Sequence, residues 1–134
     1  MFGLLIVTHV GIGEQMLTAL GQIVGPQDYA KAISIAPDDD MDACRNQILV
    51  SIKEVNTGDG VVLLTDMFGG TPSNLAISVM PKADAVVLAG VNLPVLIKLA
   101  QVRQEMGLLD AVSEAAAAGR KYIQLVTENL AASA

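Results

Sequence analysis

Gly60-Val-Val-Leu-Leu-Thr-Asp-Met-Phe-Gly-Gly-Thr-Pro-Ser-Asn74 carries the strongest fold signal in this chain. Its first part, from Val61 to Leu64, is a continuous apolar run. Such a run is typical of a strand that is buried on both faces of a parallel sheet. Asp66 follows almost at once, so an acidic side chain is expected at the carboxyl end of this strand.

The second half of the stretch predicts a turn into a helix. Gly69 and Gly70 allow a tight backbone path. The Thr71 hydroxyl is suited to an N-cap, and Pro72 is suited to the first helical position. A turn of this kind directs backbone N–H groups and the positive end of a helix dipole at one point. We therefore interpret the turn as an anion site.

A second stretch, near the N-terminus, has the same design. Phe2–Thr8 is expected to form a buried strand, and it is followed by His9, the only histidine in the sequence. Open α/β sheets place their sites at the carboxyl ends of strands. His9 and Asp66 would meet in the flavodoxin-like strand order 2-1-3-4, in which the first and third strands are neighbours. Periodicity alone leaves that order open.

The rest of the chain alternates between predicted helices and strands. Helices are expected at Glu14–Val24, Met41–Asn56, Ser73–Met80, Pro94–Arg103 and Leu108–Ala118, and further strands at Ala30–Ile35 and Ala83–Ala89. This alternation indicates an α/β fold with a doubly wound parallel sheet and helices on both faces. The length of 134 residues suits a single domain, expected over residues 1–130 with a frayed tail at 131–134.

The region after the last predicted helix is ambiguous. Gly119 is expected to end that helix. Beyond it, Lys121–Thr127 is apolar and β-branched enough to form an edge strand. The competing interpretation is a helix that continues through Gly119 to Leu130.

Composition excludes several classes of protein. The formal net charge is -6 and no Lys/Arg cluster is present, which argues against a nucleic-acid partner. No apolar run reaches the ~20 residues of a membrane-spanning helix, and no basic signal-peptide region precedes the first strand. Cys44 is the only cysteine, so no internal disulfide forms; its place on an apolar helical stripe predicts a core thiol. We expect a cytoplasmic protein.

No metal and no other cofactor are expected. The acidic triplet from Asp38 to Asp40 lacks the spacing and later ligands of a calcium loop, and an N-cap role is the simpler interpretation. One histidine and one carboxylate are too few for a zinc shell.

His9 beside Asp66 would allow phosphoryl transfer. A carboxylate that accepts one ring N–H fixes the tautomer and leaves the other nitrogen with a lone pair, which can attack phosphorus. The Thr71 hydroxyl and the amides of Gly69 and Gly70 would hold the phosphoryl oxygens. No G-x-x-x-x-G-K-[ST] nucleotide loop is present, so the donor would be another protein. A hydrogen-bonded structural histidine and a turn aspartate are the alternative.

Transfer between proteins requires a docking surface that excludes water while binding transiently. Val10 and Ile12 follow His9, and Met67 and Phe68 follow Asp66. We expect these four apolar side chains to surround the histidine as a docking face; for Met67 and Phe68 a core position is the alternative.

Three segments carry a resemblance to a known family: Val7-Thr-His9, Asp66-Met-Phe-Gly-Gly-Thr-Pro-Ser-Asn74 and Ala89-Gly-Val-Asn-Leu-Pro94. The chain resembles, over essentially its whole length, the IIA component of the mannose/fructose/sorbose class of the bacterial phosphotransferase system. The resemblance implies that His9 carries the phosphoryl group and that Asp66 orients it. It also implies that Thr71, where the family often has Ser, contacts the phosphoryl group.

The resemblance also implies partners. The donor would be the histidine-containing phosphocarrier protein, and the acceptor a IIB component that serves sugar uptake with a membrane permease complex. A stand-alone regulatory IIA, read by another protein, is the other possibility within the family. A homodimer with an exchanged antiparallel C-terminal strand is implied, and Lys121–Thr127 matches that strand in position. The phosphotransfer subunit of dihydroxyacetone kinase and a non-catalytic interaction module are the alternatives.

Overall fold

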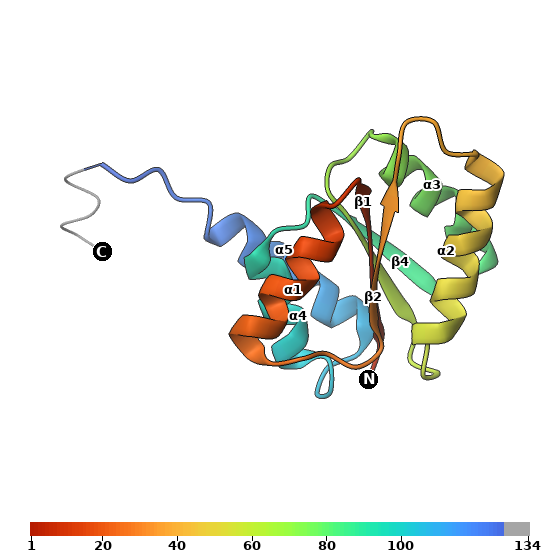
Figure 1. Ribbon diagram of the computed structural model, residues 1–134. Coiled ribbons are helices and arrows are strands. Elements are labelled where there is room, and N and C mark those ends of the chain that lie inside the picture. The colour runs from red at the N-terminus through yellow and green to blue at the C-terminus, as the bar shows by residue number, and fades with distance from the viewer. Residues whose placement is uncertain (128–134) are drawn as a thin grey trace.

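A four-stranded parallel sheet forms the centre of the computed structural model, which describes residues 1–127. Its strands are β1 (Gly3–His9), β2 (Ala30–Ile35), β3 (Val61–Thr65) and β4 (Ala85–Ala89). β1 pairs in parallel with β2 and β3, and β3 pairs with β4, which gives the order β2-β1-β3-β4. The predicted sheet order is therefore confirmed. It places the carboxyl ends of β1 and β3 side by side (Figure 1).

Helices cover both faces of the sheet, as Figure 1 shows. On one face lie α1 (Ile12–Val24), α4 (Leu93–Val102) and α5 (Leu108–Lys121); on the other lie α2 (Met41–Val55) and α3 (Thr71–Val79), and a 3-10 turn at Met80–Lys82 leads to β4. Successive side chains of a strand point to opposite faces. Leu4 accordingly packs in the core under α1, α4 and α5, whereas Leu5 packs in the core under α2 and α3. Among the described residues no helix is long and apolar enough to cross a membrane.

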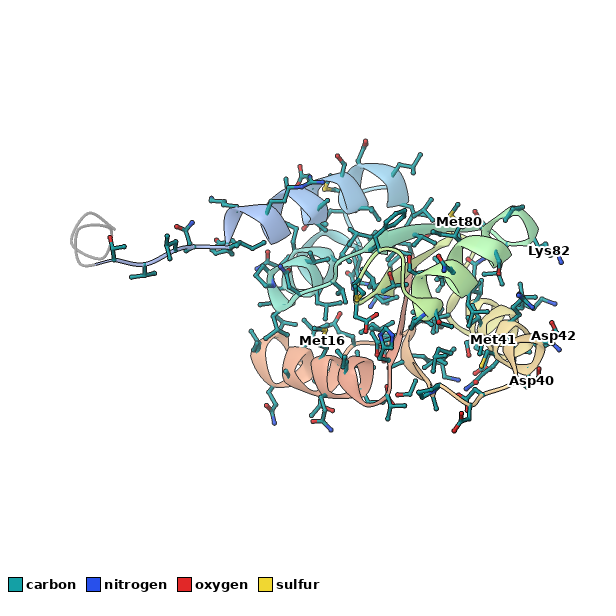
Figure 2. The ribbon with its side chains drawn as sticks, turned by 90° about the horizontal axis from the view of Figure 1, so that it is seen from above. Met16, Asp40, Met41, Asp42, Met80 and Lys82 are labelled. Atoms are coloured by element: carbon teal, nitrogen blue, oxygen red, sulfur yellow. The ribbon has the colours of Figure 1, made fainter. Side chains whose placement is uncertain are left out.

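The start of α2 explains the acidic triplet. Asp40 is the N-cap, and its carboxylate accepts a hydrogen bond from the Asp42 N–H at 3.3 Å. Figure 2 shows Asp40 and Asp42 together at this end of α2, across the sheet from Met16 of α1. The predicted capping role of the triplet is confirmed for Asp40.

Cys44, one turn into α2, is buried in the core, as predicted. Burial, and then the nearby charges of Asp39 and Asp40, raise the pKa of its thiol. A raised pKa keeps the group protonated and poorly nucleophilic at neutral pH, which suits a core side chain.

The prediction that Gly119 ends the last helix is wrong. In the structure α5 continues to Lys121. Gly119 is buried, and a Cβ at this position would lie 2.5 Å from Cγ2 of Val95 in α4. Asn92, the N-cap of α4, donates from Nδ2 to the Gly119 carbonyl oxygen at 3.2 Å. The glycine therefore permits close packing of α4 and α5 rather than helix termination.

The segment after α5 also differs from both predictions. Residues 123–127 form neither a strand nor a continuation of the helix, and the described chain adds no antiparallel strand to the sheet. Figure 1 shows this segment leading away from the body of the molecule. Most of its side chains are apolar and exposed: Tyr122, Ile123, Leu125 and Val126. The predicted frayed tail, 131–134, lies outside the described residues.

Arg103, just after α4, is a buried cation at the opposite end of the sheet from His9 and Asp66. Only 2% of its surface is exposed, and its guanidinium donates to the carbonyl oxygens of Phe2, Asp28 and Tyr29 at 2.8–3.1 Å. Burial lowers the pKa of the guanidinium, and the Asp28 charge opposes that shift. The side chain ties the loop before β2 to the start of β1. Tyr29 in that loop has a φ of 52°, a left-handed value that is uncommon for tyrosine.

Candidate active site

His9 and Asp66 form a direct pair at the carboxyl edge of the sheet. His9 is the last residue of β1, and Asp66 comes directly after β3, whose Thr65 is in register with Val7. Oδ2 of Asp66 lies 2.6 Å from Nδ1 of the His9 ring. The same oxygen accepts a hydrogen bond from the His9 N–H at 3.1 Å. One carboxylate oxygen therefore holds both the ring and the backbone of the histidine.

This geometry determines which ring nitrogen can react. An ionised carboxylate has no proton to donate, so the proton between the two groups is on Nδ1. In the neutral ring Nε2 then keeps its lone pair. Among residues 1–127 no hydrogen bond reaches Nε2. The His9 side chain is 48% exposed, whereas that of Asp66 is 13% exposed. The His9 ring is thus open to solvent, while the carboxylate bonded to it is shielded.

The Asp66 carboxyl remains ionised in spite of its partial burial. Burial by itself raises the pKa of this group, but hydrogen bonds from the His9 ring and from neighbouring backbone N–H groups outweigh it, and the net pKa lies below the ordinary value. Asp66 therefore carries a negative charge at neutral pH. A negative charge at this place would stabilise any positive charge that develops on the His9 ring.

The turn after Asp66 brings the N-terminus of α3 against the His9 ring. Gly70 is the N-cap and Thr71 the first helical residue, so the predicted capping role of Thr71 is wrong by one position. A Cβ on Gly70 would lie 3.2 Å from Cε1 and 3.8 Å from Nε2 of His9. The φ of Gly70, -81°, suits any residue, so it is the close approach of the ring and not the backbone that favours glycine here. Gly69 differs, because its φ of 88° is left-handed.

A cavity of about 340 Å³ opens beside the ring. It is lined by His9, Thr71, Ile35, Ala36, Pro37, Asp39 and Met41. Thr71 is exposed, and its hydroxyl does not cap α3, which leaves it available to a ligand in this space. The contribution of the loop after β2 was missed from the sequence. The rule that pointed to β1 and β3 would have found it, since β2 ends at the same edge.

The four residues predicted for docking are all on the surface. Val10, Ile12, Met67 and Phe68 are 62%, 40%, 57% and 77% exposed. The alternative of core positions for Met67 and Phe68 is therefore wrong. Exposed apolar side chains next to a reactive group are typical of a surface that another protein covers.

Comparison with known proteins identifies the family. Residues 3–116 match EIIA-man, described as PTS system fructose IIA component. The chain belongs to this family. It is 25% identical over 131 residues to the PTS system fructose-specific EIIA component of Bacillus subtilis (strain 168). This match covers 97% of this chain and 90% of that protein.

Two further relatives agree with the EIIA-man assignment. The chain is 29% identical over 119 residues to the PTS system mannose-specific EIIAB component of Escherichia coli (strain K12); the match covers 87% of this chain and 37% of that protein. The crystal structure of phosphotransferase system component EIIA from Streptococcus agalactiae has the same fold, with a TM-score of 0.85 at 23% identity, and the match covers 93% of this chain and 97% of that one.

As an EIIA-man protein, the chain is a phosphotransfer component and a phosphoryl carrier in sugar uptake. Membership implies a histidine-containing phosphocarrier donor and a IIB acceptor. The match favours the mannose-class interpretation over a dihydroxyacetone kinase subunit and over a non-catalytic interaction module.

Proposed function

We propose that Nε2 of His9 accepts the phosphoryl group from the phosphocarrier protein and passes it to a IIB component. The observation that carries this proposal is the 2.6 Å contact of Nδ1 with Asp66, which leaves Nε2 as the nucleophile. A bond forms between Nε2 and phosphorus as the bond from phosphorus to the donor's histidine nitrogen breaks. No proton leaves His9, because the Nδ1 proton stays on its bond to Asp66.

The phosphoryl oxygens would be held by the N-terminal turn of α3. We assign the contacts to the Thr71 hydroxyl and the amides of Gly69 and Gly70; in support, Gly70 lies against the His9 ring and Thr71 lines the cavity beside it. The first N–H groups of a helix have no intrahelical partner and attract anions. We place this transfer in the cytoplasm, next to a membrane permease complex.

The chemistry of the label tests the proposal. Incubation with phosphoenolpyruvate, enzyme I and the phosphocarrier protein should yield an acid-labile, alkali-stable phosphoryl group on the peptide that contains His9. Nuclear magnetic resonance of the labelled protein should show phosphorus on Nε2. Labelling of a His9→Ala protein, or a label on Nδ1, would contradict the assignment.

Gly70→Ala is expected to slow labelling of His9 by about tenfold, because the new methyl group would press on Cε1 and crowd Nε2. Gly107→Ala is the matched control. Gly107 is also a helix N-cap with an ordinary φ, -68°, but no atom lies within 4 Å of its Cβ position. Initial rates of labelling should separate the two variants. Equal labelling rates for the two variants would contradict a steric role of Gly70.

We propose that the docking face consists of Val10, Ile12, Met67 and Phe68. Titration with the phosphocarrier protein should shift the amide resonances of these residues, and Phe68→Ala should weaken binding by about tenfold. Leu109→Ala is the control, because Leu109 is also an exposed apolar side chain, with 70% exposure, in the first turn of α5. Its neighbour Leu108 contacts Gly60 at the amino end of β3, the opposite end of the sheet from His9. Shifts confined to that end of the sheet would refute the assigned face.

We also propose a homodimer in which residues 122–127 of one chain pair with the β4 edge of the other. The segment is exposed and largely apolar, and β4 is an unpaired edge of the described sheet. Both features promote association, and pairing them in a two-fold assembly would bury both.

Truncation after Lys121 tests the dimer and leaves α5 whole. Sedimentation velocity should show a monomer, and thermal melting a lower midpoint, for the truncated chain. A full-length chain with residues 122–127 replaced by glycine and serine should behave like the truncated one. A truncated protein that stays dimeric with an unchanged midpoint would exclude the exchanged strand.

A further inference from the structure

Thr8 carries a fully buried hydroxyl directly before His9. The residue has an exposure of 0%. Its Oγ1 donates to the His9 carbonyl oxygen at 2.8 Å and accepts a hydrogen bond from the Gly13 N–H at 2.8 Å. The hydroxyl therefore joins the backbone on both sides of the short turn, Val10 and Gly11, that connects β1 to α1.

The N-terminus of α1 depends on this hydroxyl. Its N-cap is Gly11, with a φ of 83° and no side chain to cap the helix. The Gly13 N–H, which has no partner within the helix, bonds to Thr8 instead. A Cβ on Gly13 would lie 3.2 Å from the Thr8 Oγ1 and 3.0 Å from Cγ2 of Ile6, so glycine allows the helix to approach the strand.

His9 is consequently held by its backbone from two sides. Asp66 accepts from its N–H at 3.1 Å, and Thr8 donates to its carbonyl oxygen at 2.8 Å. Together these bonds restrict the two peptide planes next to the histidine and thus the direction of its Cα–Cβ bond. Within residues 1–127 the ring is hydrogen-bonded only at Nδ1, so the position of Nε2 depends on that direction together with the contact to Asp66.

We propose that Thr8 is a positioning residue for phosphoryl transfer: its hydroxyl sets the direction in which His9 presents Nε2 to the donor and the acceptor. This inference rests on the proposed function of His9. A merely structural role would make Thr8 important for stability, but the rate per folded molecule would not depend on it.

Three substitutions separate these roles. Thr8→Val removes both hydrogen bonds at nearly constant shape, and Thr8→Ser retains the hydroxyl. Thr65→Val is the matched control: Thr65 stands directly before Asp66 as Thr8 does before His9, and it is equally buried, but its hydroxyl has no partner among the described residues. If Thr8→Val does not fold, Thr8→Cys gives the same comparison, because a thiol of similar size is a weak donor and acceptor.

The measurements are the initial rate of His9 labelling per folded molecule and the ¹⁵N resonances of the His9 ring. Thr8→Val is expected to lower the rate by about tenfold through misplacement of Nε2 and to broaden or shift the ring resonances. Thr8→Ser should recover most of the rate, and Thr65→Val should match the wild type in both measurements.

Unchanged rates and ring resonances in Thr8→Val would overturn the positioning role. An equal loss in Thr65→Val would also overturn it, since that would show a general effect of packing at the strand ends. Failure of the underlying function appears differently, as an absence of label on His9 in the wild-type protein.

Discussion

Asp66→Asn is expected to slow phosphoryl transfer to His9 about a hundredfold without unfolding the protein. The amide group has nearly the shape of the carboxylate but can turn its NH₂ group toward Nδ1. The His9 proton would then move to Nε2, which would lose the lone pair that attacks phosphorus. The variant also lacks the charge that stabilises the ring during transfer, 2.6 Å from Nδ1 in the present structure.

Single-turnover labelling rates would measure this loss, with Asp42→Asn as the control. Asp42 is an exposed carboxylate on α2, paired with Arg45 away from His9, so its substitution should leave the rate unchanged. Ring resonances should report the second tautomer in Asp66→Asn. A variant with the wild-type rate would show that Asp66 does not select the tautomer.

The lowered Asp66 pKa adds a check on stability. A carboxyl whose pKa is lower in the folded than in the unfolded state stabilises the fold above the unfolded pKa, and this contribution is lost as the pH falls through the folded value. The difference in unfolding free energy between wild type and Asp66→Asn should therefore shrink on acidification.

Arg103→Met is expected to lower the free energy of unfolding by about 3–5 kcal/mol. Methionine fills much of the space of the arginine stem but donates no hydrogen bonds. The Phe2 carbonyl oxygen would lose two donors, Nε at 3.1 Å and Nη2 at 2.8 Å, and the Asp28 carbonyl oxygen would lose Nη1 at 2.8 Å. The Phe2 carbonyl group is buried, and a buried carbonyl without a partner is costly; the left-handed Tyr29 would also lose part of its support.

Urea denaturation would measure this effect, with Arg45→Met as the matched control. Arg45 is a surface arginine that is paired with Asp42 three residues earlier, so its loss should cost at most about 0.5 kcal/mol. Arg103→Lys should lie between the wild type and Arg103→Met, because one ammonium group cannot reach all three carbonyls. The labelling rate per folded molecule should stay unchanged in Arg103→Met, since the loop that Arg103 holds is at the opposite end of the sheet from His9. Wild-type stability in Arg103→Met would mean that water replaces the guanidinium.

Sequence pattern was enough to predict the strands of the sheet and the pairing of His9 with Asp66. Its buried strands are continuous apolar runs, each followed within two residues by a polar group, and these patterns are local. Strand pairing then brings His9 and Asp66 together, because parallel strands end at one edge of the sheet. The N-cap of α3 was predicted one residue too late: it is Gly70, whose Cβ position would lie only 3.2 Å from Cε1 of His9, a contact that the sequence does not show.

The roles of residues whose partners are distant in sequence became apparent only in the folded structure. Glycine often ends a helix, so Gly119 was predicted to do so. Its close contacts with Val95 and Asn92 of the neighbouring helix explain why a glycine lies inside α5 instead. Arg103 resembles an ordinary surface cation in sequence and is instead a buried donor to carbonyl groups that lie 74 to 101 residues earlier in the chain. Thr8 reads as part of a strand until its hydroxyl is seen between His9 and Gly13. Local pattern reports the period and polarity of a segment, whereas a hydrogen bond or a close approach depends on which segment lies opposite, and that is known only once the chain has packed.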